Sequence, residues 1–155
     1  MSLRLGETKI KGVNLPSYDF IKAFFDAGGK CGYSTATSFA GVIPFTATSD
    51  VTAMNRMFSS CSRLTSVPSF DISNVTNMYS MFYNCSKLEA IHMLNIGADL
   101  DISSSTLFTR EALLEIIGNL NTVTSTKKLT MGATNLAKLT EEDKAIATNK
   151  GWTLA

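Results

Sequence analysis

Apolar and polar positions between residues 43 and 96 follow one pattern that returns every 24 residues. The octet VTAMNRMF, which starts at Val51, returns as VTNMYSMF at Val75, and 75 − 51 = 24. Other pairs of similar residues at this offset are Cys61 and Cys85, Leu64 and Leu88, Val67 and Ile91, Phe70 and Leu94, and Ile72 and Ile96. So many matches at one offset indicate an internal repeat, with two full copies and half of an earlier one that starts near Ile43.

Each copy divides into two parts with different patterns. The first part opens with helix N-cap residues, Asp50 or Ser73-Asn74, and then has apolar residues at helical spacing, which predicts a short helix. The second part, of which 64–72 is one example, has sparser apolar residues and predicts a short strand. A unit this small cannot bury its apolar face alone, so we expect the copies to stack as an α/β solenoid of short helices and parallel strands.

Sulfur-containing residues recur with the same period. The methionines at equivalent positions are Met54, Met57, Met78 and Met81. Recurrence favours core packing between copies, and the alternative is a flexible binding groove. Cys61 and Cys85 are expected to be small buried residues, because the three cysteines form no C-x-x-C pair and zinc needs ligands in close pairs. The lone His92 has no partner at ligand spacing, so we expect no metal site.

The N-terminal flank contains two predicted elements. Residues 17–29 form an amphipathic helix that ends at a Gly-Gly pair and is expected to cap the open end of the stack. Residues 1–16 form an arm or small hairpin with apolar Leu3, Leu5 and Ile10. An isolated hairpin is marginal in water, so these three residues must pack on the capping helix or dock on a neighbouring subunit.

The C-terminal third, residues 97–155, departs from the repeat but keeps its alternation of elements. Thr109 opens a strongly amphipathic helix, and Thr140 followed by three acidic residues opens another. Strands are expected at Leu129 and at Trp152, and 152 − 129 = 23 is close to the repeat period. Residues 17–155 are therefore predicted to form a single domain closed by two degenerate helix–strand turns.

Composition excludes several classes of function. The chain has 155 residues, 17% of them charged, with a formal net charge of +1. Nucleic acid and anionic membrane are disfavoured as partners, because both require clustered basic residues. No apolar run reaches about 18 residues, so membrane insertion is not expected. The start lacks the apolar segment of a secretory signal. The protein therefore stays where it is made, leaves by another route, or lacks a signal already removed.

Catalytic chemistry is not expected either. The chain offers one His and neither a G-x-S-x-G nor an H-E-x-x-H motif, so no nucleophile and base can be assigned. Asp99 and Asp101 lack the glycine of a calcium loop and are interpreted as a solvated turn. We therefore expect no enzyme activity, no catalytic residues and no cofactor.

The phrase NVTNMYSMFYNCSKL, at residues 74–88, closely resembles the BspA-type leucine-rich repeats, over roughly residues 43–96. The resemblance implies a leucine-rich-repeat-like solenoid and a binding or adhesion protein rather than an enzyme. The segment 108–155 looks like the closing segment of prophage-encoded proteins with such repeats. The opening LRLGETKI, at residues 3–10, is similar to the starts of small phage tail and virion proteins.

These resemblances suggest two functions. The leading hypothesis is a phage structural protein of the tail, baseplate or head fibre, made in the host cytoplasm and multimeric in the virion. In it Leu3, Leu5 and Ile10 dock on other virion proteins or on a second copy, and the solenoid faces a host surface protein or glycan. The alternative is a bacterial cell-surface adhesion module. Candidate binding residues on the exposed strand face are Ser66, Pro68, Ala90, His92, Lys128, Thr130 and Thr153.

Overall fold

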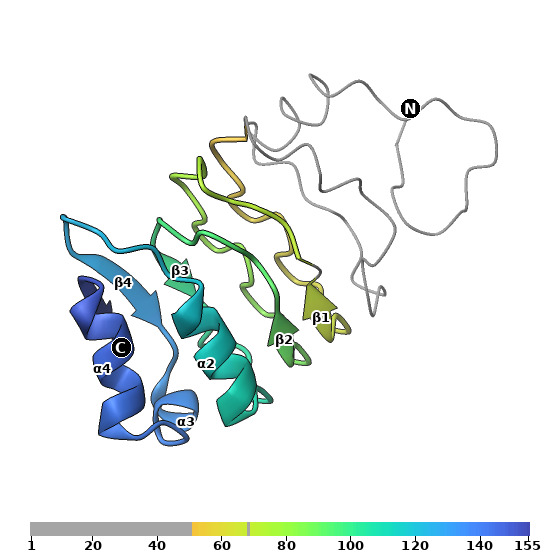
Figure 1. Cartoon of the computed structure of the whole chain (residues 1–155). Coiled ribbons are helices and arrows are strands. Elements are labelled where there is room, and N and C mark those ends of the chain that lie inside the picture. The colour runs from red at the N-terminus through yellow and green to blue at the C-terminus, as the bar shows by residue number, and fades with distance from the viewer. Residues whose placement is uncertain (1–50, 68) are drawn as a thin grey trace, which may run out of the picture.

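The computed structural model describes residues 51–67 and 69–155, and it shows a mixed α/β arrangement of small parallel sheets with few helices (Figure 1). The strands are β1 (Ser66–Val67), β2 (Ala90–Ile91), β3 (Leu100–Asp101), β4 (Lys127–Thr130) and β5 (Trp152–Leu154). The helices are α2 (Arg110–Gly118), α3 (Ala133–Leu136) and α4 (Glu141–Asn149). The predicted arm with Leu3, Leu5 and Ile10, the predicted capping helix 17–29, and Pro68 lie outside the described residues.

The strands form two sheets, β1–β2 and β3–β4–β5, and all three strand pairings are parallel. Ser66 pairs with Ala90 and Val67 with Ile91, so the register of the first sheet is the repeat offset of 24. The prediction that strands near residues 67, 91, 129 and 153 run parallel is confirmed, and so is the neighbourhood of the first two. Strand β3 was not predicted.

The helices predicted inside the repeats are wrong, because residues 54–60 and 78–84 are turns. The reason lies in the backbone hydrogen bonds. The N–H groups of residues 54, 56, 58 and 60 donate to the carbonyl oxygens of residues 77, 79, 81 and 83, over 2.7–3.0 Å. An α-helix would direct those donors to carbonyls four residues back in the same copy. Here alternate donors instead join one copy to the next.

Backbone dihedral angles at equivalent positions also exclude a helix. Arg56 and Ser80, which are 24 residues apart, have φ of 61° and 54°. Ser60 and Asn84, again 24 apart, have φ of 66° and 61°. Left-handed residues interrupt a right-handed helix. The apolar spacing of three arises instead from tight turns, as in the bond from the Met81 N–H to the residue 78 carbonyl oxygen at 3.0 Å.

The core runs through the described part of the chain and contains the repeat's apolar residues. The four repeated methionines have at most 2% of their surface exposed, which confirms that they pack in the core. The rings of Phe58 and Phe82, at equivalent positions, stack with centroids 5.5 Å apart and planes within 5°. Cys61 and Cys85 are buried as predicted, and the Cys85 thiol donates to the carbonyl oxygen of Phe58 at 3.0 Å. Burial, with a smaller effect of Cys61, raises the pKa of Cys85 to about 12.

The C-terminal helices begin where the sequence places them. The Thr109 side chain accepts a hydrogen bond from the Ala112 N–H at the start of α2. Thr140 and Asp143 form a reciprocal capping box at the start of α4. Both helices, predicted from their N-caps and apolar pattern, are confirmed. Helix α3 was not predicted.

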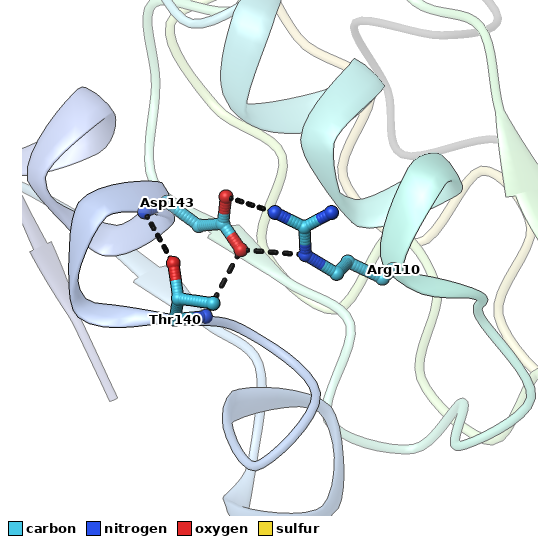
Figure 2. A network of polar contacts seen from close by, with 3 residues as sticks. All are labelled: Arg110, Thr140 and Asp143. Carbon is cyan, nitrogen blue, oxygen red and sulfur yellow. Dashed lines mark hydrogen bonds and ion pairs between the residues drawn. The ribbon is translucent and has the colours of Figure 1, made fainter.

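A bidentate ion pair joins the first turns of α2 and α4 (Figure 2). Arg110 donates from Nε to Oδ2 of Asp143 at 2.8 Å and from Nη2 to Oδ1 at 2.7 Å. The dipole of α2 disfavours a cation at its N-terminus, and the carboxylate compensates this charge. The hydrogen bonds from Arg110 lower the pKa of Asp143, and the Thr140 backbone N–H adds to the effect. The pair is a structural link between the two helices.

Helix α2 packs against both β2 and α4, as Figure 1 shows. His92, which follows β2, places Nδ1 2.6 Å from Oε1 of Glu115 in α2. Helix α2 therefore lies beside β2, where a further copy would have placed another strand.

Candidate binding site

The outward side of the sheet β3–β4–β5 carries the polar side chains of its strands. Leu100 and Leu129 pair with each other and are buried, whereas the neighbouring Asp101 and Thr130 form the next pair. Lys128 is exposed on β4. Side chains alternate between the two faces of a strand, so these polar groups share the solvent side. The segment before β3 supplies a further acid, Asp99.

Short hydrogen bonds hold the two carboxylates of this face. Oδ1 of Asp99 accepts the backbone N–H of Lys128 at 2.8 Å. Oδ1 of Asp101 accepts the backbone N–H and the hydroxyl of Ser103 at 2.9 and 2.7 Å. Within the described part of the chain, Oδ2 of either carboxylate accepts no hydrogen bond. Each group is therefore fixed by one oxygen and offers the other to solvent or a ligand. The pair belongs to a strand and the segment before it, so its interpretation as a turn was wrong.

A pocket of about 220 Å³ opens between this sheet and the second repeat copy. Its apolar floor is formed by Met78 and Leu100, both buried. Its polar rim is formed by Tyr79, Ser80, Asp99, Asp101, Lys128 and Thr130. The pocket lies at a break in the backbone pairing: residue 77 pairs with residue 53 and residue 101 with residue 130, but no described pair joins residue 77 to β3.

Tyr79 supplies the aromatic part of the rim. Its side chain is 68% exposed although its backbone is held on both sides. The Tyr79 N–H donates to Oδ1 of Asn77 at 3.0 Å, and its carbonyl oxygen accepts the Arg56 N–H at 2.9 Å. The guanidinium carbon of Arg56 lies 5.9 Å from the centroid of the Tyr79 ring, within the range of a cation–π contact. An exposed aromatic ring on a fixed backbone is a common element of binding surfaces.

The sequence-predicted binding residues fall into two groups. Lys128 and Thr130 line the pocket, and Thr153 pairs with Lys128 on the neighbouring strand β5. Ser66 and Ala90 are half-buried partners in the other sheet. His92 contacts Glu115, and Pro68 lies outside the described residues. The predicted single strand face is therefore divided between two sheets.

Three pocket residues were not among the predicted binding residues: Tyr79, Asp99 and Asp101. A signal for Tyr79 exists in the sequence, because the equivalent position of the first copy holds Asn55. A tyrosine at a polar position of the repeat departs from the pattern and marks an exposed aromatic. Nothing in the sequence pattern indicates that the two carboxylates lie beside it.

Two further chemical features were searched for in the described part of the chain. It contains no group of three His, Cys, Asp or Glu side chains that could bind a metal ion. None of its helices combines the length and apolar character that crossing a bilayer requires.

These features define an α/β repeat protein whose sequence copies lie side by side through parallel backbone pairing. The chain belongs to the family described as "Mycoplasma protein of unknown function, DUF285", whose model matches residues 31–112, or 82 of 155 residues. This match is consistent with the resemblance to BspA-type repeats and gives no support to the phage resemblance. Comparison with curated proteins and with solved structures returned no match.

Proposed function

We propose that this protein is a non-enzymatic binding module, in which a leucine-rich-repeat-like solenoid presents the Tyr79 pocket to a partner on a cell surface. The observation that carries the proposal is the pocket itself. It combines an exposed aromatic ring, two half-satisfied carboxylates and a lysine on backbone held by parallel pairing. Pockets with an apolar floor and a few convergent polar groups are the usual form of ligand sites.

Backbone pairing at successive places supports the solenoid. Ala53 pairs with Asn77 at an offset of 24, as do the residues of β1 and β2. A further pair, Asp71 with Leu94, has an offset of 23, and Ile96 with Leu120 again has 24. A chain that pairs with itself repeatedly near one offset winds with nearly constant turn length, as solenoids do.

Exposure of the two pocket carboxylates argues against hydrolysis. A pair of carboxylates can cleave glycosidic bonds only if one of them stays protonated as a general acid, which requires a buried or negatively charged setting. Asp99 and Asp101 are both exposed, and Lys128 lies on the same rim. His92, the chain's one histidine, contacts Glu115 instead. These features favour recognition over catalysis.

The test of the proposal is binding of the full chain to intact cells. Fluorescently labelled protein is incubated with bacterial and mammalian epithelial cells, and bound protein is measured by flow cytometry. The variant Tyr79→Ala with Lys128→Glu should lower binding at least tenfold with an unchanged melting temperature. Tyr83→Ala is the matched control, because Tyr83 is 63% exposed and does not line the pocket. Equal binding by both variants, or no binding by the native chain to any cell, would exclude the proposal.

A virion protein is the second candidate, in which Leu3, Leu5 and Ile10 dock the same module on a phage particle. The resemblance of residues 3–10 to virion protein starts is the observation that favours it. Mass spectrometry of particles induced from the source strain should then detect this chain. Deletion of residues 1–12 should abolish its incorporation without lowering its melting temperature. Particles that lack the chain would exclude this candidate.

A further inference from the structure

We propose that the Tyr79 pocket binds one pyranose ring of an uncharged or amino-bearing glycan. This inference rests on the proposed function and names the class of its ligand. It follows from the size of the pocket, the pairing of apolar and polar groups around it, and the balance of its charges.

The size of the pocket admits only a small group. Its volume of about 220 Å³ lies below the roughly 300–1,000 Å³ typical of pockets for drug-sized ligands. A nucleotide or a large organic cofactor does not fit in this space. A single sugar ring or a single amino-acid side chain does, with the rest of the ligand extending into solvent.

The chemistry of the walls matches a sugar ring on both of its aspects. A pyranose has a C–H face that packs on apolar and aromatic surface, and Met78, Leu100 and Tyr79 provide such surface. Its edge carries hydroxyl groups that both donate and accept. The Oδ2 atoms of Asp99 and Asp101 can accept from two hydroxyls, and Lys128 can donate to a third. Because one oxygen of each carboxylate is already hydrogen-bonded, these acceptors lose little conformational freedom on binding.

The charges of the rim select among ligands. Two carboxylates and one ammonium leave a net charge of −1, which repels sialic acids, uronic acids and phosphorylated sugars. Lys128 on the same rim also disfavours a lysine or arginine side chain, which would otherwise suit the two acids. Arg56 comes from the preceding copy and lies over the Tyr79 ring. A neutral ring with several hydroxyls meets all of these conditions.

The direct experiment is NMR titration of the full ¹⁵N-labelled chain with glucose, galactose, mannose, N-acetylglucosamine and glucosamine, each up to 50 mM. We expect at least one of them to shift the amide signals of Tyr79, Asp101 and Lys128. Tyr79→Ala should weaken that binding at least tenfold, and Tyr83→Ala should leave it unchanged. Sialic acid should cause no shifts at these positions. No shifts with any neutral or amino sugar, or equal effects of both variants, would overturn the inference.

A second experiment separates failure of this inference from failure of the proposed function. Cells are treated either with periodate, which cleaves the vicinal diols of glycans, or with protease before protein is added. The glycan inference predicts that binding through Tyr79 is lost after periodate and survives protease. Binding that survives periodate and is lost after protease would identify a protein partner. The proposed function would then stand and the glycan ligand would be excluded.

Discussion

Stacking of Phe58 on Phe82 gives the most direct test of how the two repeat copies pack. Both rings are fully buried, with centroids 5.5 Å apart and planes within 5°. A change of shape in a packed core usually costs up to about 1.5 kcal/mol, so Phe58→Leu and Phe82→Leu should each destabilise by about that amount. An aromatic pair contributes about 0.5–1.5 kcal/mol beyond burial, and either single change already removes it. The double variant should therefore cost about 0.5–1.5 kcal/mol less than the sum of the two singles.

Urea unfolding provides the assay for this double-mutant cycle. Trp152 is the chain's one tryptophan, is 2% exposed and donates from Nε1 to the Asn121 carbonyl oxygen at 2.8 Å, so its fluorescence reports unfolding. Circular dichroism must give the same transition, because repeat proteins can unfold in parts. Phe82→Leu combined with Leu139→Ala, beside α4, is the control and should be additive within about 0.5 kcal/mol. If the two phenylalanine changes also add within about 0.3 kcal/mol, the copies do not stack through these rings.

Four further predictions concern single positions. Met81→Ala should destabilise by about 2–5 kcal/mol in urea unfolding, the usual cost of truncating a buried methionine, and a loss below about 0.5 kcal/mol would contradict its burial. The Cys85 thiol should resist thiol reagents at pH 8 until the protein is unfolded. Its pKa of about 12 lies above the ordinary 9.0, so its contribution to stability is complete below pH 9 and is lost as the pH rises toward 12, which alkaline melting curves would detect. Asp143→Asn should lower the melting temperature above the ordinary carboxyl pKa of 3.8, and the difference should shrink as the pH falls below that value, because pairing with Arg110 lowers the pKa of the native carboxyl. Ser60→Gly should stabilise by about 0.5–1 kcal/mol and Ser60→Val should destabilise by about 1–2 kcal/mol, because φ is 66° at this position; equal melting temperatures for the two variants would contradict the left-handed backbone.

Local chemistry explains which elements the sequence predicts correctly. Helices α2 and α4 are encoded by their own residues, with Thr109 and Thr140 as N-caps followed by an apolar stripe. The parallel pairing of β1 with β2 follows from the offset of 24, since equivalent residues of stacked copies must lie side by side. In both cases the evidence lies within one short segment or in the comparison of two similar ones.

Partners outside a segment explain the failures. The Met78 segment has apolar residues three positions apart, which suits both a helix and a series of tight turns. Its form is decided by where the backbone donors of the neighbouring copy point, and no side-chain pattern records this. The pocket depends likewise on a break in pairing between Asn77 and β3. Tyr79 alone was visible in advance, as a tyrosine where the first copy has Asn55.

The alternate backbone bonds between residues 54–60 and 77–83 have a consequence for how such chains change in length. Each bond crosses from one copy to the next at a constant separation, so one whole inserted copy finds its partners in the same register as its neighbours. An insertion of a single residue would instead exchange buried and exposed positions throughout a paired segment. Gene duplication can therefore lengthen the molecule by whole units of 24 residues, while slippage by one codon is selected against. Natural variants of different reach should differ by multiples of this unit and share the same closing helices.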